Sequence, residues 1–274
     1  MCKCTKIWVM VIAFVLLLGL QPAARAGDIE AYMDTSTGHF GLMDLTTGVY
    51  SDIGNMGQLL GGLGVFGGLL YSEVSQGITL YQVNPATGAL TAVPTTGAAP
   101  AGGFGDNGST TTGLYVLDGF ASVDYNLYSI NPITGVVTLV GSTGVAVGGP
   151  TTSGLSAGSS TLYFTNANSL YTINTSTGLA TFVGDMGNTG AQVDAMVFSG
   201  GTLYGGEGTP TVQVLTINPS TGTASAGPAL TNSNGHFYGL APANVAPVPE
   251  PSSFALLLVG VAAVLFALNR RVAP

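Results

Sequence analysis

Basic residues are almost absent from this sequence. All five Lys and Arg among the 274 residues lie near the two ends, and none occurs between Gly27 and Val248, where there are twelve Asp and Glu. A segment this acidic repels phosphate backbones and cannot neutralise them, which excludes nucleic-acid binding. The same absence excludes lysine Schiff bases, P-loops and arginine clamps for carboxylates.

Cysteine and tryptophan are missing from the same segment. Cys2, Cys4 and Trp8 lie at the N-terminus, and the sequence has no others. The segment from Gly27 onward therefore has no disulfide, thiol nucleophile or thiolate metal site. Its stability must come from a buried core, and it is long enough to build one in a single domain.

The N-terminus has the three parts of a secretory signal peptide. They are basic residues at Lys3 and Lys6, an apolar run over residues 7–20, and a small-x-small cleavage site at Ala24 and Ala26. We expect signal peptidase to remove residues 1–26, so that the mature chain begins at Gly27. An uncleaved anchor helix is the alternative, but so short a run reaches only about 21 Å, less than a bilayer core. A lipoprotein is disfavoured because no Cys follows the run.

The C-terminus, residues 245–274, has a different pattern. Its features are a proline-rich linker containing Pro249, Glu250 and Pro251, a wholly apolar run over residues 254–268, and then Arg270 and Arg271. Each Pro disfavours helix in the linker. We expect a transmembrane helix over residues 254–268, lengthened by polar flanks and snorkelling arginines. Arginines beyond such a helix favour the cytoplasmic side, which places the rest of the protein outside.

The order of Pro-Glu-Pro, apolar helix and arginines resembles the PEP-CTERM sorting signal over residues 248–274. The resemblance implies recognition by an exosortase, a membrane protease-transferase that cuts near the motif. It also implies a final location on the cell surface or in the extracellular matrix, together with exopolysaccharide. Three residues follow the arginines, so the basic cluster is short. An ordinary tail anchor is the alternative.

Between the two ends, one turn pattern recurs five times. Each copy has Asn or Asp first and Gly fifth; the copies are residues 44–48, 84–88, 131–135, 174–178 and 218–222. Asn or Asp caps such a turn, Pro presets φ at the second position, and Gly closes it in the left-handed conformation. Alternating strands flank each turn, and a Tyr-marked strand and a small-apolar strand precede it. Four strands in about 44 residues is the size of a β-propeller blade.

The repeats are offset at the ends of this region. The first begins at Tyr32 without a small-apolar strand, whereas residues 236–241 look like that strand with no Tyr partner after it. We therefore predict an all-β fold, a five-bladed β-propeller over residues 27–244, in which this last strand completes the first blade and leaves no open edge. An open β-solenoid or sandwich is the alternative. The region also resembles secreted bacterial proteins with Leu-Tyr-x-Ile-Asn-Pro-x-Thr-Gly repeats, which implies a propeller-like fold and no settled activity.

Residues with catalytic potential are few. His39 and His236 are the only histidines, and we expect both at strand edges in the first blade, where the offset makes them neighbours. Four acids lie near the predicted channel strands or in loops beside the next strand: Asp106, Asp118, Asp194 and Glu207. We interpret them as solvated loop acids or a weak calcium site. Paired carboxylates also hydrolyse glycosidic bonds, which is the alternative.

The sequence therefore predicts an exported protein with a structural, adhesive or binding role and no catalytic residue, resident metal or cofactor. Exosortase and signal peptidase are the expected processing partners. An extracellular polysaccharide, as in a biofilm matrix, is a partner by family resemblance only. The repeat tyrosines are predicted to be core residues. The alternative function is a carboxylate-dependent glycan hydrolase or lyase outside the cell.

Overall fold

The recurring turn closes in the same way in all five copies. The backbone N–H of its glycine donates to the carbonyl oxygen of its first residue at 2.7–2.9 Å, and the glycine φ lies between 71° and 82°. Glycine enters this left-handed region without the steric cost that a Cβ imposes. In the third copy, the Asn131 side chain also accepts a hydrogen bond from the N–H of Ile133, as expected of Asn at the start of a turn.

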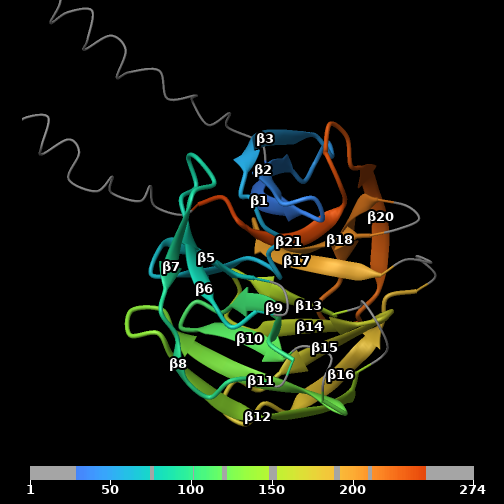
Figure 1. Ribbon diagram of the computed structural model, residues 1–274. Helices are drawn as coiled ribbons and strands as arrows, with labels where there is room; N and C mark the ends of the chain where they lie inside the picture. Colours follow the sequence, from blue (N-terminus) through green and yellow to red (C-terminus); the bar gives the residue numbers. More distant parts are fainter. Residues whose placement is uncertain are drawn as a thin grey trace, which may run out of the picture.

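The structure, a computed structural model, describes residues 29–74, 77–100, 102–118, 122–147, 153–187, 192–208 and 212–244. These residues form 21 strands and no helix. The strands build five antiparallel four-stranded blades (Figure 1). The all-β fold, the blade number and the four strands per repeat are thereby confirmed.

The blades follow the chain, and the strands of each are named from the inner to the outer one. Blade 1 consists of β21 (Phe237–Pro242), β1 (Glu30–Thr35), β2 (His39–Asp44) and β3 (Tyr50–Asn55). Blade 2 consists of β4 (Gly64–Phe66), β5 (Leu69–Glu73), β6 (Leu80–Val83) and β7 (Leu90–Val93). Blade 3 consists of β9 (Phe104–Ser109), β10 (Leu114–Asp118), β11 (Asp124–Asn131) and β12 (Val136–Ala146), with β8 (Thr96–Gly97) added at its outer edge.

The last two blades share one continuous sheet. Blade 4 consists of β13 (Ser153–Ala157), β14 (Leu162–Asn166), β15 (Ser169–Ile173) and β16 (Ala180–Asp185). Blade 5 consists of β17 (Val193–Ser199), β18 (Thr202–Glu207), β19 (Gln213–Ile217) and β20 (Ala224–Ala229). The inner strands β13 and β17 pair in parallel through Ser156 opposite Met196 and Ala157 opposite Val197, which joins the two blades.

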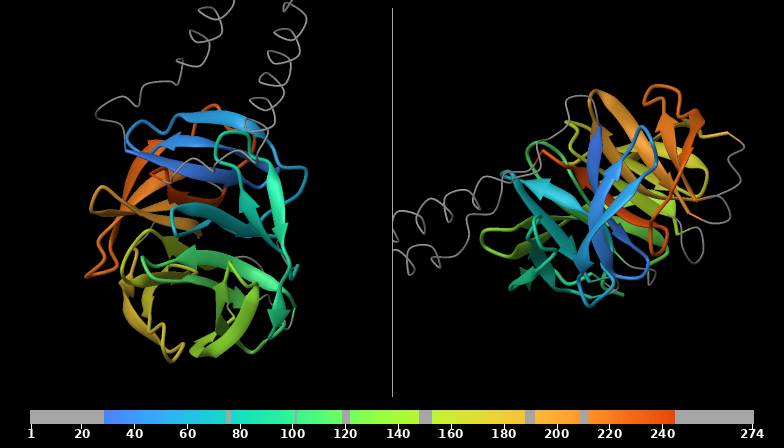
Figure 2. Two further views of the ribbon diagram at one scale, coloured as in Figure 1. Left: turned by 90° about the vertical axis from the view of Figure 1, so that its left-hand side faces the viewer. Right: turned by 90° about the horizontal axis from the view of Figure 1, so that it is seen from above.

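The five inner strands lie around one axis, and glycines let them approach closely (Figure 2). A parallel bridge joins Gly62, just before β4, to Asn107 on β9. A Cβ on Gly108 of β9 would lie only 2.6 Å from the carbonyl oxygen of Ser156 on β13. A Cβ on Gly239 of β21 would lie 2.7 Å from the Cα of Gly62. Real Cβ atoms do not approach that closely, so the centre of the ring is packed backbone against backbone.

The C-terminal strand closes the ring. β21 pairs antiparallel with β1, from residue 31 opposite 242 to residue 34 opposite 239, and Figure 1 shows these two strands next to each other. The side chains of Phe237 and Leu240 on β21 are buried in one cluster with Met33 and Met43. The predicted completion of the first blade is therefore confirmed.

The repeated turn also joins neighbouring blades at the rim. A Cβ on Gly135 would lie 1.8 Å from the carbonyl oxygen of Pro94 in the preceding blade, and one on Gly48 would lie 2.1 Å from that of Ala229. These glycines are required twice, once for the left-handed φ and once for the contact with the blade before. The same close approach recurs at Gly178 and Gly222, whereas a Cβ on Gly88 would lie 3.4 Å from the Phe40 ring, so only the left-handed φ requires glycine there.

The hydrophobic core is divided among the spaces between blades. Each of five clusters joins buried side chains of neighbouring blades, as Tyr71 and Leu80 of blade 2 pack with Phe104 and Val116 of blade 3. Of the five repeat tyrosines, Tyr71 and Tyr204 are buried as predicted. The other three are partly buried and pack against the clusters: Tyr32, Tyr115 and Tyr163. All strands and clusters lie between residues 29 and 244, and this segment contains its own core.

Two sequence predictions fall on other parts of the chain. The signal peptide over residues 1–26 and the transmembrane helix over residues 254–268 lie outside the described residues. In the part of the chain that the structure does describe, no helix has the length and apolar character needed to cross a membrane.

Deletion of residues 236–242 should unfold or strongly destabilise the protein. Loss of the buried Phe237 and Leu240 side chains alone costs about 3–6 kcal/mol, a large part of an ordinary domain's stability, and β1 becomes an open edge. The melting temperature of this variant, followed by circular dichroism, should fall far below that of a control truncated after Asn244. Equal melting temperatures for the two truncations would contradict the closed ring.

Candidate functional site

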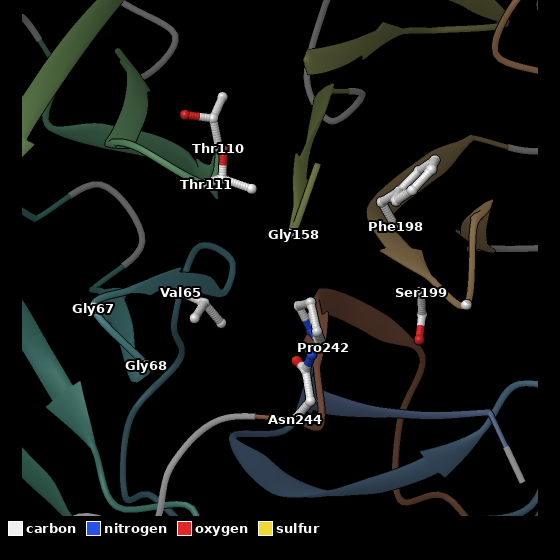
Figure 3. Close-up of a pocket in the computed structure, with 11 residues that line it drawn as sticks. Val65, Gly67, Gly68, Thr110, Thr111, Gly158, Phe198, Ser199, Pro242 and Asn244 are labelled. Atoms are coloured by element: carbon white, nitrogen blue, oxygen red, sulfur yellow. The ribbon is translucent and has the colours of Figure 1, made fainter. Parts of the chain in front are cut away.

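A pocket of about 490 Å³ opens where the inner strands end (Figure 3). Because the five inner strands run in the same direction, their last residues and the loops that follow meet on one face of the ring. The pocket is lined by residues from all five blades: Val65, Gly67, Gly68, Thr110, Thr111, Gly158, Phe198, Ser199, Gly200, Pro242 and Asn244. Its volume lies in the range of small-molecule sites, roughly 300–1,000 Å³.

Glycine turns keep the mouth of this pocket open. The hairpins β4–β5 and β17–β18 each turn through two glycines with positive φ, Gly67–Gly68 and Gly200–Gly201, the conformation of a type I′ turn. At Gly158 a Cβ would lie 2.4 Å from the Pro242 ring. At these positions the rim carries no side chains that would fill the space.

The side chains that do line the pocket are uncharged. Thr111 and Asn244 are exposed, Ser199 and Phe198 are partly buried, and Thr110 is buried. In Figure 3 they surround the space from separate blades. Three hydroxyl groups, one amide and one aromatic ring can donate and accept hydrogen bonds and stack on an apolar surface. The pocket is therefore suited to a neutral, hydroxyl-bearing ligand.

The four acids singled out in the sequence fall into two pairs on separate blades. Asp106 and Asp118 belong to blade 3, and Asp194 and Glu207 belong to blade 5, with blade 4 between them. The expectation of solvated loop acids is wrong for three of them. Asp106, Asp118 and Glu207 lie within strands and are at most 5% exposed, because the neighbouring blade covers the strands that carry them.

Asp118 has a structural explanation. Its carboxylate accepts hydrogen bonds from the backbone N–H of Asn126 at 2.8 Å, the Asn126 side chain at 2.7 Å and the Ser122 hydroxyl at 2.6 Å. Asp118 therefore joins the end of β10 to Ser122 and to Asn126 on β11. A carboxylate with this set of donors is well satisfied where it is.

Asp194 and Glu207 lie at one end of blade 5. Glu207 is opposite Val193 in the β17–β18 pair, and its Oε2 accepts a hydrogen bond from the Gln213 side chain. Burial raises the pKa of Asp194 to about 7. Since β18 runs against the inner strand β17, its end lies at the face where the inner strands begin. Neither acid lines the pocket at the opposite face.

Sequence reasoning missed two buried acids at the centre of the ring. Asp34 on β1 and Glu73 on β5 are fully buried, and no hydrogen bond of normal geometry reaches the carboxyl oxygens of either. Burial raises the pKa of Asp34 to about 8, and a contact with its own backbone amide offsets part of the rise. Both acids stand two residues after the repeat Tyr of their blade, Tyr32 and Tyr71. This shared repeat position is the feature of the sequence that could have identified the two acids.

Glu73 lies close enough to Asp34 for the two charges to repel each other. Burial first, and then the Asp34 charge, raises the pKa of Glu73 to about 8. The Asn107 side chain lies beside Glu73 and offsets part of this rise, although no hydrogen bond of normal geometry joins the two.

The two histidines lie together in blade 1, as predicted. The His39 Nδ1 lies 3.0 Å from Asp52 Oδ1, and its Nε2 lies 3.3 Å from the amide nitrogen of Asn234. His236 Nδ1 lies 3.0 Å from the Ser36 hydroxyl, and burial lowers the pKa of His236. These contacts join the turn after β1 to the segment before β21.

The residues that follow the propeller match a known sequence motif. Residues 247–271 match the description of the PEP-CTERM protein-sorting motif. The chain carries a PEP-CTERM sorting motif. The motif marks an exported surface protein that an exosortase recognises, with a C-terminal region anchored in the membrane. It begins three residues after Asn244 on the pocket wall, a reach of about 11 Å at most.

Two solved structures resemble this one at low sequence identity. A chain of the nidogen–laminin complex is 15% identical, with a TM-score of 0.52, over 78% of this chain and 81% of that one. Regucalcin, a calcium-binding protein from Agrobacterium tumefaciens str. C58, is 16% identical, with a TM-score of 0.46, over 74% of this chain and 71% of that one. The first likeness supports the propeller fold alone. No curated protein shows significant sequence similarity.

Replacing Asp194 with Asn should change the pH dependence of stability. The folded-state pKa of about 7 exceeds the ordinary value of about 3.9, so the folded protein binds the extra proton. This acid therefore lowers stability as pH rises from about 4 to about 7, and Asp194→Asn should gain stability over the wild type across that window.

Urea unfolding at pH 4, 6 and 8 measures this effect as the difference in midpoint between variant and wild type. The exposed Asp185, replaced with Asn, serves as the control and should show no comparable trend. A difference between Asp194→Asn and wild type that is the same at all three pH values would contradict the burial of Asp194.

Proposed function

We propose that this protein acts outside the cell by binding a neutral polysaccharide in the pocket at the end of the inner strands. In this proposal, signal peptidase removes residues 1–26, the propeller over residues 27–244 folds outside the membrane, and exosortase acts on the tail over residues 245–274. The protein would then serve as a structural or adhesive component at the cell surface or in the matrix.

The observation that carries the proposal is the chemistry of the pocket. No residue that lines it is charged, and the lining includes three hydroxyl groups, one amide and one aromatic side chain. Neutral sugars offer many hydroxyl groups and an apolar ring face, which such a surface can bind by hydrogen bonds and stacking. A strongly charged polymer would lose its hydration there without gaining a partner.

The position of the pocket fits a role close to the cell envelope. Asn244 is on its wall, three residues before the sorting motif. At the other end of the described chain, the Ile29 side chain lies against Gly200 on the same wall. Both ends of the propeller are therefore at the pocket face, so a bound polymer would be held beside the attachment point of the protein.

Binding rather than turnover is supported by the placement of the acids. Glycoside hydrolysis uses two carboxyl groups on either side of one bond, whereas the pocket is lined by none. One observation favours the alternative: Asp194, with its raised pKa, and Glu207 both lie at one end of blade 5. A general acid needs such a pKa, so a hydrolase or lyase acting at the opposite face is the second candidate.

A glycan-array screen of the purified protein should detect neutral glycans, and calorimetry should then give their affinity. We expect Phe198→Ala to weaken binding about tenfold, because loss of a stacking ring costs about 1.4 kcal/mol. The matched control is Phe182→Ala, which removes an exposed phenylalanine of the outer strand β16 and should bind normally.

Two results would contradict the binding proposal. One is equal affinity in Phe198→Ala and Phe182→Ala, which would place the ligand elsewhere. The other is consumption of the glycan, measured by released reducing ends, that disappears in Asp194→Asn or Glu207→Gln. The second result would establish the enzyme in place of the binding protein.

A further inference from the structure

Three buried polar side chains at the centre of the ring have no hydrogen-bond partner of normal geometry. They are Asp34, Glu73 and Asn107, and each is at most 1% exposed. They come from β1, β5 and β9, on blades 1, 2 and 3. Buried polar groups in folded proteins are nearly always satisfied. Three unsatisfied groups in one place therefore indicate a ligand.

The three side chains converge on the backbone of residues 61–62. A Cβ on Gly61 would lie 2.6 Å from Glu73 Oε1, and a Cβ on Gly239 would lie 2.3 Å from Asp34 Oδ1 and 2.7 Å from the Cα of Gly62. The backbone of Asn107 is bridged to Gly62, and its side chain lies beside Glu73. Because Gly61 and Gly239 have no side chain, there is space for the two carboxyl groups at these positions.

The fold itself does not require acids at this repeat position. The residue two places after the repeat Tyr is Leu117 in blade 3, Thr165 in blade 4 and Gly206 in blade 5. The Thr165 hydroxyl lies 3.3 Å from the Gly154 carbonyl oxygen and 3.0 Å from that of Val193, and it is fully satisfied by backbone. Only blades 1 and 2 place a carboxyl group there, and no hydrogen bond of normal geometry reaches either one.

We propose that Asp34, Glu73 and Asn107 form a buried site for a single calcium ion that joins blades 1, 2 and 3. Two carboxylates balance the charge of a divalent cation, and two carboxylates with one amide oxygen supply up to about five of the six to eight oxygen ligands that calcium takes. The carbonyl oxygen of Gly105, 3.1 Å from the same Cβ position on Gly61, is a further donor. Magnesium fits less well, because it retains several waters and this site is closed to solvent.

The site combines two acids with one amide. Among the described residues, no group of three His, Cys, Asp or Glu side chains is placed to hold a metal. In this site the third side chain is an amide. Bound calcium would neutralise two carboxyl groups that are costly to bury as charges, and it would hold β1 beside the strand that closes the ring.

Thermal unfolding of the purified full chain, with calcium chloride or with EDTA present from before refolding, tests the site. We expect calcium to raise the melting temperature by on the order of 5 °C, with one calcium per chain found by native mass spectrometry. Calcium sites of extracellular modules bind at about 10⁻⁴–10⁻³ M, so millimolar calcium is the concentration to use. The double variant Asp34→Asn/Glu73→Gln should lose the calcium effect, and the control Asp194→Asn should keep it.

A second variant keeps the test decisive if the double variant does not fold. Asn107→Asp preserves shape and adds a third carboxylate, so it should enlarge the difference in melting temperature between calcium and EDTA. An identical melting temperature in calcium and EDTA for the wild type, with no bound calcium, would overturn the proposal. A calcium effect that survives in Asp34→Asn/Glu73→Gln would overturn it as well. Failure of glycan binding at the pocket would leave both readouts unchanged.

Discussion

The pairing of β21 with β1 is the interaction on which the rest of the structure depends. Next to this pairing, the backbone N–H of Ser36 donates to the carbonyl oxygen of His236, and the two side chains are in hydrogen-bond contact, although the residues are 200 apart in sequence. Every other blade is built from consecutive strands and forms from local contacts. Blade 1 alone requires both ends of the segment. If β21 leaves, the cluster around Phe237 loses one side, and β1 is exposed as an edge.

Both sites in the ring require this closure. The pocket takes Pro242 and Asn244 from the closing end of the chain and its other walls from loops of blades 2 to 5. The buried acids lie where β21 approaches the start of β4, at Gly239 and Gly62. A protein in which β21 is not paired with β1 would lack part of the pocket wall and would expose the buried acids. Any function of either site therefore depends on the same pairing of β21 with β1 that stabilises the fold.

The fold separates neutral from acidic chemistry. The pocket face carries hydroxyl, amide and aromatic groups, whereas the acids of β5, β10 and β18 stand at the ends of strands that run toward the opposite face. The neutral-ligand binding that we propose would depend little on salt, because no charged side chain lines the pocket. The buried acids, in contrast, demand a proton or a cation. The propeller thus has an uncharged pocket at one face and a separate group of buried acids at its centre.

Much of the fold could be predicted because its signals are local. Gly135 and the other turn glycines occur in a five-residue pattern whose chemistry defines a turn, and the missing first strand identified the closing one. The pocket could not be predicted, because Thr110, Phe198 and Asn244 meet only when distant strand ends share a face. Acid burial was misjudged at Asp118 for a related reason. Alternation within a strand does not reveal that a neighbouring blade covers both of its faces.

Amide hydrogen exchange tests the central claim of ring closure most directly. Backbone amides of β1 and β21 that pair with each other should exchange as slowly as those of the continuous β13–β17 sheet, because all open only when the ring unfolds. Mass spectrometry of peptides covering residues 30–35 and 237–242 measures this. Equal protection in all four strands is the predicted result. Rapid exchange of β21 and β1 beside a protected β13–β17 sheet would show that the ring is open and would contradict its closure by β21.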